Sequence, residues 1–243
     1  MMSAEAAPGA GMIHLRVRDL HAWYGESHVL HGVDLEVPEG HVVTILGRNG
    51  AGKSTTLKSI MGMMKRRSGD IAFNGRDISH LRAFDVARLG IAFCPEDRGI
   101  FSGLSVRENL LLPPVVADGG IPVQTLYHQF PNLAASLDRP GTRLSGGEQQ
   151  MLAIARILRT GARFLLLDEP TEGLAPVIVK QIGRTLAQLK RDGYTILLVE
   201  QNYRFASQIA DSHFVMEHGR VIDRIDRSQL KSQEAKLLAY LGV

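Results

Sequence analysis

The segment GRNGAGKST, from Gly47 to Thr55, has the residue types and the spacing that hold a phosphate group. It matches the pattern G-x-x-x-x-G-K-[ST] and stands between an apolar run and a helical pattern, the context that this motif requires. The glycines let the backbone wrap a phosphate with its N–H groups pointing inward. Lys53 is then expected to reach the β- and γ-phosphates of a nucleotide, and the Ser54 hydroxyl to bind Mg²⁺. The alternative interpretation is a plain glycine-rich turn, which would not need all of these positions.

Two acidic residues, Asp168 and Glu169, follow the apolar run FLLL and precede Pro170. Parallel sheets bind ligands at the carboxyl ends of their strands, so we expect this acid pair to lie beside the phosphate loop. Asp168 is then expected to hold Mg²⁺ directly or through water, and Glu169 to act as general base on the attacking water. The alternative is a solvated acidic turn, which is more common for one carboxylate than for two.

Alternating or apolar runs predict the strands that must position these motifs. They lie at residues 13–20, 33–37, 41–47, 90–94, 163–168 and 195–200. The last three are continuous apolar runs, which are typical of sheets covered on both faces. A helix is expected from about Lys53 to Met63, and Asn74-Gly75 and His218-Gly219 are hairpin signals. Residues from about 102 to 159 contain no convincing strand and read as a helical insertion. The predicted class is therefore α/β, with a mostly parallel core, an antiparallel edge region and a helical subdomain.

The totals limit the class of protein. A chain of 243 residues forms one large domain or two small ones. Cys94 is its only cysteine, so no intrachain disulfide is possible and a reducing compartment fits. The longest apolar runs are far shorter than the roughly 18 residues of a membrane span, and the N-terminal residues lack the pattern of a signal peptide. We interpret KRR, at residues 65–67, as a solvated loop rather than a nucleic-acid patch.

The segment LSGGEQQ, from Leu144 to Gln150, adds a third motif. Ser145 and Glu148 predict a capping box at the start of an amphipathic helix. The glycines at 146 and 147 are poor helix formers, and they make sense if this helix end must approach an anion very closely.

With these three motifs, the sequence resembles the ATP-binding cassette (ABC) family, whose signature is LSGGQ. The resemblance covers about Ile13 to Val243 and implies a P-loop (RecA-like) ATPase core that binds ATP and Mg²⁺. It implies an ABC ATP-binding domain at 13–243, which contains the helical subdomain at about 102–159. Residues 1–12, which lie outside the resemblance, are expected to form a flexible N-terminal tail. In that family two cassettes pair head to tail, so the signature of one chain is expected to contact the γ-phosphate held by Lys53 of the other.

The resemblance also assigns site residues. Tyr24 stands where the family places an aromatic that stacks on adenine, the alternative being an ordinary strand-end aromatic. The expected catalytic residues are Lys53, Glu169 and Gln201, and the expected metal ligands are Ser54 and Asp168. The expected nucleotide-binding residues are Tyr24, Gly47, Arg48, Asn49, Gly50, Ala51, Gly52, Lys53, Ser54, Thr55, Glu96, Ser145, Gly146, Gly147 and Glu148.

Three departures from the family pattern indicate a subgroup. Glu96 stands where glutamine is usual, Ala175 replaces an aspartate, and Gln201 replaces the histidine that senses the γ-phosphate. An amide at position 201 can donate a hydrogen bond but carries no charge. Together these segments resemble the ATPase subunits of branched-chain amino acid importers, the LivF type, and their urea and short-amide relatives. Asp97, where that subgroup has glycine, leaves the transported substrate open.

The resemblance implies an ATP-hydrolysing importer subunit, an ATPase coupled to two transmembrane permeases and indirectly to a periplasmic or extracellular binding protein. A second ABC ATPase is the expected partner, in a heterodimer or alternatively a homodimer. The expected location is peripheral, on the cytoplasmic face of the inner (plasma) membrane, and no nucleic acid is expected as a partner.

The alternatives are a urea or short-amide importer ATPase, a soluble non-transport ABC ATPase acting on nucleic acid, and a non-hydrolytic regulatory scaffold. Lys53 and Ser145 are fewer than a hundred residues apart, with no heptad run between them, which argues against the nucleic-acid class. The intact Lys53, Asp168 and Glu169 argue against the scaffold.

Overall fold

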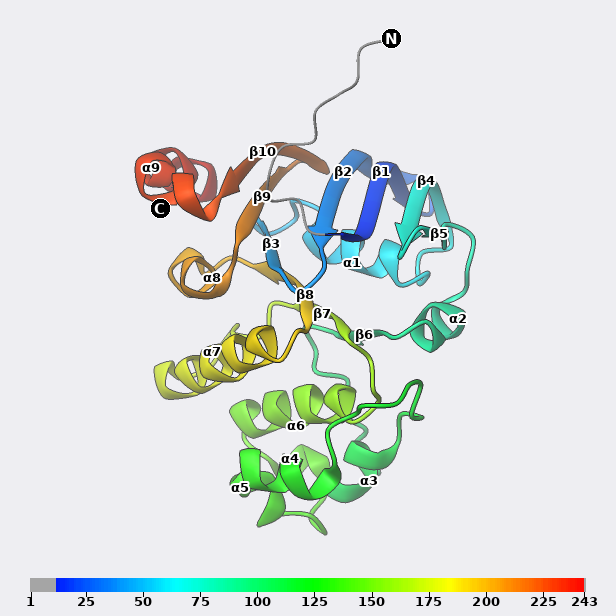
Figure 1. The fold of residues 1–243 in the computed structure, drawn as a ribbon, viewed down its shortest axis with the longest axis vertical. Helices are drawn as coiled ribbons and strands as arrows, with labels where there is room; N and C mark the ends of the chain where they lie inside the picture. The colour runs from blue at the N-terminus through cyan, green and yellow to red at the C-terminus, as the bar shows by residue number, and fades with distance from the viewer. Residues whose placement is uncertain (1–11, 243) are drawn as a thin grey trace.

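The computed structural model describes residues 12–242, which form two sheets flanked by helices (Figure 1). Apart from Met12, the predicted N-terminal tail lies outside the described residues. The strands are β1 (Ile13–Tyr24), β2 (Ser27–Pro38), β3 (Val42–Leu46), β4 (Arg66–Phe73), β5 (Arg76–Asp77), β6 (Ile91–Cys94), β7 (Phe164–Asp168), β8 (Thr195–Glu200), β9 (Ser212–Glu217) and β10 (Arg220–Asp226). The helices are α1 (Lys53–Ile60), α2 (Ala83–Arg88), α3 (Val106–Leu111), α4 (Val123–Gln129), α5 (Pro131–Ala134), α6 (Gly146–Leu158), α7 (Pro176–Arg191), α8 (Tyr203–Ile209) and α9 (Leu230–Leu241).

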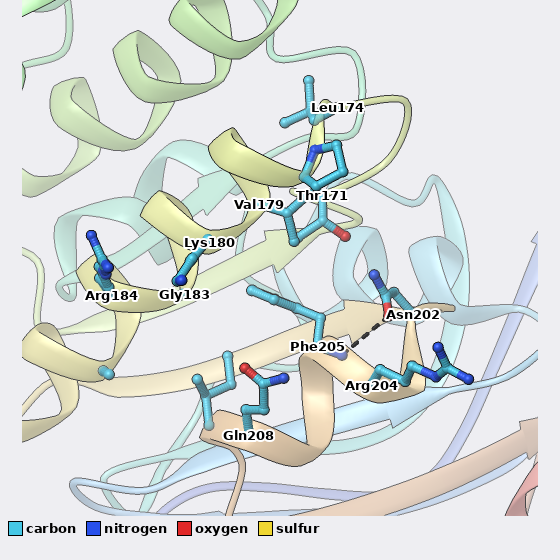
Figure 2. Close-up of a pocket in the computed structure, with 13 residues that line it drawn as sticks. Thr171, Leu174, Val179, Lys180, Gly183, Arg184, Asn202, Arg204, Phe205 and Gln208 are labelled. Atoms are coloured by element: carbon cyan, nitrogen blue, oxygen red, sulfur yellow. Dashed lines mark hydrogen bonds between the residues drawn. The ribbon is translucent and has the colours of Figure 1, made fainter.

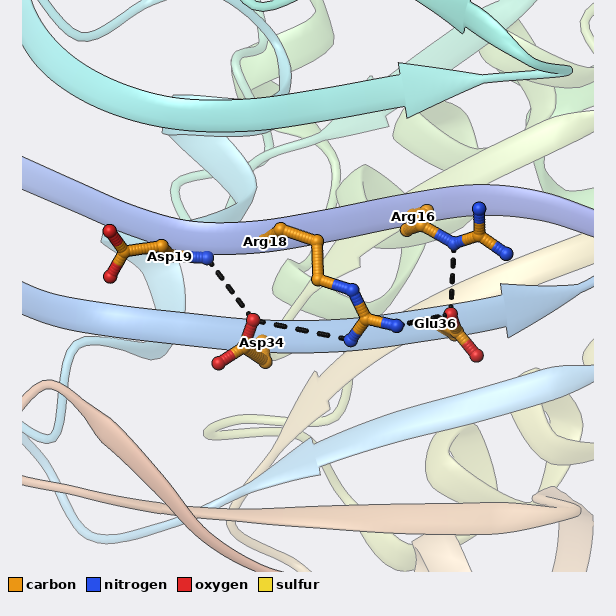
Figure 3. Close-up of polar contacts among 5 residues, drawn as sticks. All are labelled: Arg16, Arg18, Asp19, Asp34 and Glu36. Atoms are coloured by element: carbon orange, nitrogen blue, oxygen red, sulfur yellow. Dashed lines mark hydrogen bonds and ion pairs between the residues drawn. The ribbon is translucent and has the colours of Figure 1, made fainter. Parts of the chain in front are cut away.

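One sheet is antiparallel and has the strand order β2-β1-β4-β5. Along β1, Leu15 and Val17 are buried while Arg16 and Arg18 face solvent, so one face packs on the core. Both arginines reach across to Glu36 on β2, at 2.9 and 2.7 Å (Figure 3). Exposed ion pairs contribute at most about 1 kcal/mol each, so burial of the apolar face is what holds this sheet.

The other sheet has the order β10-β9-β3-β8-β7-β6, and all neighbouring strands are parallel except β10 and β9. Leu165 and Leu167 of β7 pack in the cluster that contains α6 and α7. Leu166 packs in the cluster on the opposite face, which contains α1 and the antiparallel sheet. The prediction of strands covered on both faces is confirmed, and with it the α/β class.

Both predicted hairpins are present. The β4–β5 turn contains Asn74 and Gly75 at φ 50° and 75°, and the β9–β10 turn contains His218 and Gly219 at φ 46° and 73°. A two-residue turn with φ > 0 at both positions matches the twist of the strands that it joins, which is why the Asn-Gly signal is strong.

Two local predictions are corrected. Helix α1 ends at Ile60 rather than near Met63, because Gly62 adopts φ 73° and terminates the helix. The segment 65–67 is not a solvated loop, since β4 begins at Arg66. The Arg67 guanidinium donates hydrogen bonds to the carbonyls of Ser79 and Leu81, and it therefore closes a turn of this chain.

Residues 102–159 hold the helices α3 to α6, which lie at the end of the molecule opposite the antiparallel sheet (Figure 1). Helix α6 packs on the parallel sheet through Leu152, Ala155 and their neighbours. The assignment of this stretch as a separate subdomain stays a prediction. Within residues 12–242, every helix is too short or too polar to cross a membrane.

Candidate functional site

The carboxyl ends of three parallel strands meet at one edge of the second sheet. Leu46, the last residue of β3, pairs with Glu200, the last residue of β8. Asp168, the last residue of β7, pairs with Val199 on the other side of β8. Because these strands run in the same direction and in register, the loops after them begin at the same edge. The structure thereby brings together the phosphate-loop segment, the acid pair and the segment LLVEQN.

The segment 47–55 forms a turn that leads into α1. Gly50 and Gly52 have φ 80° and 104°, a conformation that favours glycine, and Gly52 is the N-cap of α1. Gly47 has a different reason to be glycine, because a Cβ there would lie 2.3 Å from the Met216 carbonyl oxygen of β9. The first N–H groups of α1 are consequently available at the sheet edge, where a helix N-terminus attracts anions.

A cavity of about 300 Å³ lies against this turn. Its lining residues are Val29, Asn49, Gly50, Gly52, Lys53, Ser54, Thr55, Glu96, Glu169 and Glu172. Eight of the ten are residues that the sequence analysis expected at the site, from three separate segments. Sequence reasoning missed the other two, Val29 and Glu172. An apolar residue on an alternating strand carries no signal of a binding role, and Glu172 in the segment TEG reads as an ordinary turn residue.

The three residues expected to be catalytic are in direct contact. Lys53 Nζ lies 3.0 Å from Glu169 Oε1, and the Gln201 side-chain amide donates to Glu169 Oε2 at 2.5 Å. Lys53 and Glu169 are only 3% and 7% exposed. Glu169 adopts φ 46°, a left-handed conformation that costs a non-glycine residue roughly 1–2 kcal/mol. Such strain persists only where the surroundings hold it, and it is common at functional sites.

The residues expected to bind the metal are also adjacent, and their donor set fits Mg²⁺. The Ser54 hydroxyl donates to Asp168 Oδ1 at 2.8 Å. Burial, reinforced by Glu169 and Glu96, raises the pKa of Asp168 to about 6 against the lowering effect of the Ser54 hydrogen bond. Among residues 12–242, no three His, Cys, Asp or Glu side chains are arranged as a metal site. A Mg²⁺ ion held mainly by water and phosphate oxygens needs only one or two protein ligands, so this pair suffices.

The signature segment lies at the start of α6. Ser145 is the N-cap, and the predicted capping box is present: the Ser145 N–H donates to Glu148 Oε2 at 2.8 Å, and the Glu148 N–H donates to Ser145 Oγ at 3.4 Å. A Cβ on Gly147 would lie 2.8 Å from Ile178 of α7, so this glycine is also required by packing within the chain. Neither these residues nor Gly146 line the 300 Å³ cavity of their own chain.

Other expected residues hold the phosphate loop in place or lie outside the cavity. The Arg48 carbonyl accepts a hydrogen bond from Lys53 Nζ at 3.2 Å, and the Ala51 carbonyl accepts one from the Gly219 N–H at 2.9 Å. Tyr24 ends β1, is 49% exposed and does not line the cavity. Its expected contact with adenine stays a prediction.

The segment from Glu96 to Phe101, called the Glu96 segment below, is hydrogen-bonded to α6. Glu96 lines both the 300 Å³ cavity and a neighbouring one that reaches Asp168. Arg156 of α6 donates to the carbonyls of Gly99 and Arg98, at 2.6 and 2.7 Å. Sequence reasoning missed Arg156, because an arginine on an amphipathic helix reads as a solvent-facing residue. Arg156 therefore ties α6 to the backbone at residues 98 and 99, two to three residues after Glu96.

A further cavity, of about 700 Å³, lies between α7 and α8 (Figure 2). Lys180, Arg184 and Arg204 line it, and no acidic residue does within the described part of the chain. Thr171 and Asn202 lie at one end of it. Nothing in the sequence marked this cavity, since its walls come from two helices separated by β8.

Comparison with known proteins identifies the family. The family model of the ABC transporter matches residues 30–172, more than half of the chain. The branched-chain amino acid transport ATP-binding protein BraG of Pseudomonas aeruginosa is 40% identical over 90% of this chain and 96% of its own length. The probable branched-chain amino acid transport protein LivF of Archaeoglobus fulgidus is 39% identical over 94% and 99%. The lipopolysaccharide export ATP-binding protein LptB of Escherichia coli is 32% identical over 95% and 98%.

Solved structures agree. A nucleotide-free ATP-binding cassette from an ABC transporter superposes with a TM-score of 0.81 at 26% identity, covering 96% of this chain and 99% of that one. The ADP conformation of an ATP-binding cassette of an ABC transporter superposes with a TM-score of 0.77 at 27% identity, covering 94% of this chain and 98% of that one. This chain therefore belongs to the ABC transporter family and is an ATP-binding cassette ATPase.

Proposed function

We propose that this chain is the ATP-hydrolysing subunit of an importer for branched-chain amino acids. The observation that carries the enzymatic part is the contact of Glu169 with both Lys53 and Gln201, beside the pair formed by Ser54 and Asp168. The transport class rests on the 40% and 39% identity to BraG and LivF, both named as branched-chain amino acid transport proteins.

Glu169 is the proposed general base. Its two oxygens face Lys53 and Gln201, so the carboxylate is oriented before ATP arrives. Lys53 binds the γ-phosphate in this proposal, which requires the ammonium group to exchange Glu169 Oε1 for phosphate oxygens. Glu169 Oε1 is then free to accept a proton from the attacking water. Gln201 keeps hold of Oε2 and donates to the γ-phosphate or to the water.

Ser54 and Asp168 are the proposed ligands of Mg²⁺. They would hold the ion where it could neutralise charge on the phosphates of the nucleotide. The raised pKa of Asp168 reflects a buried carboxylate near two others, a setting that a cation relieves. The Ser54 hydroxyl donates to Asp168 in this structure, and its oxygen would be available as a ligand because a hydroxyl also carries acceptor lone pairs.

The remaining expected residues complete a composite site. We propose that the turn 47–55 and Glu96 bind ATP in one chain, and that residues 145–148 contact its γ-phosphate from a second ATPase subunit. The separation of the signature from the cavity of its own chain supports this arrangement. A heterodimer is the proposed assembly, with a homodimer as the alternative.

Coupling to two membrane permeases is proposed at an apolar cavity of about 540 Å³ beside the Glu96 segment. Phe101, Leu112 and Val116 line it, and Phe101 is 52% exposed. Exposed apolar patches of this kind mark contacts with other proteins. Arg156 links this surface to the Glu96 segment, so permease and nucleotide sites share one element. We propose that the chain acts at the cytoplasmic face of the membrane and serves a substrate-binding protein indirectly, with no nucleic acid as a partner.

The transported substrate is the part to test. In the source cell, the gene would be replaced by one that encodes Lys53→Ala, and uptake of labelled leucine and of urea would be measured. We expect leucine uptake to be lost while urea uptake stays normal. Loss of urea uptake alone would favour the urea and short-amide class. Normal uptake of both solutes, with a defect in lipopolysaccharide export, would favour the role named for LptB, which is 32% identical.

A further inference from the structure

Glu200 is a buried carboxylate to which the proposed mechanism gives no role. It ends β8, directly before Gln201, and is 2% exposed. It forms no ion pair within residues 12–242. The Thr171 hydroxyl donates to Glu200 Oε1 at 2.7 Å, and the Asn202 N–H donates to Oε2 at 3.3 Å. Burial raises the pKa of this carboxyl to about 7. Burying a carboxyl group costs folding free energy, and this cost is offset only while its hydrogen bonds to neighbouring groups are kept.

Three successive residues at the end of β8 and directly after it hold two residues of the loop after β7, Glu169 and Thr171. The Val199 carbonyl accepts from the Glu169 N–H at 3.0 Å, and the Gln201 amide donates to the Glu169 carboxylate at 2.5 Å. Between these two contacts, Glu200 accepts from Thr171, two residues after Glu169. Glu169 is thus fixed at its N–H, at its carboxylate and, through Thr171, on its C-terminal side.

The third contact acts where the loop is strained. Glu169 stands at φ 46°, which L-residues rarely adopt, and the contacts around it must maintain this conformation. In the described part of the chain, the Thr171 hydroxyl makes the side-chain hydrogen bond that ties the residues directly after Glu169 to β8, and its removal leaves them without such a bond. The backbone of Glu169 could then relax, and its carboxylate would shift relative to Lys53.

We propose that Glu200 and Thr171 are positioning residues: their hydrogen bond holds the loop after β7 against β8 and keeps the Glu169 carboxylate in place for water activation. This inference rests on the proposed role of Glu169 as general base. Neither Glu200 nor Thr171 lines the 300 Å³ cavity beside the turn 47–55, so in this proposal both act through Glu169 rather than on the nucleotide. Figure 2 shows Thr171 at the end of the α7–α8 cavity, which it lines.

The test compares Thr171→Val, which removes the hydroxyl at nearly constant volume, with Thr171→Ser, which keeps it. The full-length protein is assayed for phosphate release in the assembly in which the wild type hydrolyses ATP. Rates are divided by the number of ATP-binding sites, so misfolded molecules do not count. We expect Thr171→Val to lower kcat about tenfold, because a small displacement of a catalytic group from its reactive position slows the reaction strongly. KM for ATP should stay within about twofold, and Thr171→Ser should restore most of the rate.

Double variants identify the path of the effect. Glu200→Ala should lower kcat at least as much as Thr171→Val does, because it removes the Thr171 hydrogen bond and also the acceptor of the Asn202 N–H. Adding Thr171→Val to Glu200→Ala should lower kcat no further, because the hydrogen bond that the two residues share is already lost. Thr171→Val should add nothing to Glu169→Gln, since it acts through that carboxylate. A wild-type kcat in Thr171→Val would overturn the inference. So would a double variant, with either Glu200→Ala or Glu169→Gln, whose decrease in kcat equals the product of the two single decreases. Wild-type turnover in Glu169→Gln would instead refute the assigned base, so the two failures are distinguishable.

Discussion

Lys53 Nζ and Glu169 Oε1 lie 3.0 Å apart in a site where both side chains are nearly inaccessible to solvent. Breaking a buried pair by removing one partner leaves an uncompensated charge, which is costly. In the proposed mechanism, an incoming phosphate supplies Lys53 with a replacement partner and leaves Glu169 Oε1 free to accept a proton from water. The pair therefore links nucleotide binding to the release of the proposed base.

Glu169→Gln should bind ATP but hydrolyse it poorly. An amide keeps the shape of the side chain and cannot accept the proton of the attacking water, so kcat should decrease by a factor of about 10² or more. Phosphate release measures the rate, and size-exclusion chromatography with ATP should show accumulation of a dimer. Lys53→Ala is the matched control and should abolish both turnover and the ATP-dependent dimer. Hydrolysis by Glu169→Gln at the wild-type rate would exclude Glu169 as the base.

Gln201→Ala should lower ATP turnover, because it removes the amide that donates to Glu169 Oε2. Removal of one charge-assisted hydrogen bond of this kind costs about 1.5–3 kcal/mol, which is roughly a ten- to hundredfold change if it is expressed in the transition state. Gln201→His should retain activity, since imidazole can donate from the same position. Unchanged ATP turnover in Gln201→Ala would exclude a role for the Gln201 amide in hydrolysis.

Glu200→Gln should change how stability depends on pH. The pKa of Glu200 is raised to about 7 by burial, so the native state keeps a proton that the unfolded chain loses near 4.5. The wild type should therefore lose unfolding free energy as pH rises from about 4.5 through 7, by up to about 3 kcal/mol. The amide does not titrate, so the stability of the variant relative to wild type should rise between pH 5 and pH 8 in urea unfolding. Glu217→Gln, on the exposed end of β9, is the matched control, and a parallel pH profile for Glu200→Gln and wild type would contradict the prediction.

Gly147→Ala should destabilise the protein although alanine favours helices. The new Cβ would lie 2.8 Å from Ile178 Cγ1, and overpacking of this kind costs about 1–3 kcal/mol, against a gain of about 1 kcal/mol in helix propensity. Ile178→Ala removes all three side-chain carbons that the new Cβ would meet, so in that background Gly147→Ala should cost less stability in urea unfolding than it does in the wild type. Gly146→Ala is the control, because its Cβ would meet only the flexible end of Arg98 at 3.4 Å or more. Equal unfolding free energies for Gly147→Ala and Gly146→Ala would contradict the claim that packing against Ile178 requires glycine at position 147.

The sequence determined the parts of this protein that depend on local pattern. The phosphate loop, the acid pair and the signature are contiguous motifs, and their glycines, charges and flanking apolar runs state the chemistry directly. Strand periodicity and the two hairpin signals predicted the elements, because side-chain alternation and φ > 0 turns are properties of neighbouring residues. The capping box of Ser145 and Glu148 was predicted for the same reason.

Contacts between distant segments were decided only by the tertiary structure. That Gln201 and Glu169 share a hydrogen bond, and that Glu200 binds Thr171, follows from the adjacency and register of β7 and β8. No local pattern encodes strand order, so each of these residues alone looked like a strand end or a helix cap. The sequence alone suggests a solvated loop at Arg67 and an anion contact at Gly147. It does not show the turn that Arg67 closes or the packing of Gly147 on Ile178, because those partners lie elsewhere in the chain. Residue types thus specify which chemistry is possible, while the packing of the sheet brings the reacting groups within hydrogen-bond distance.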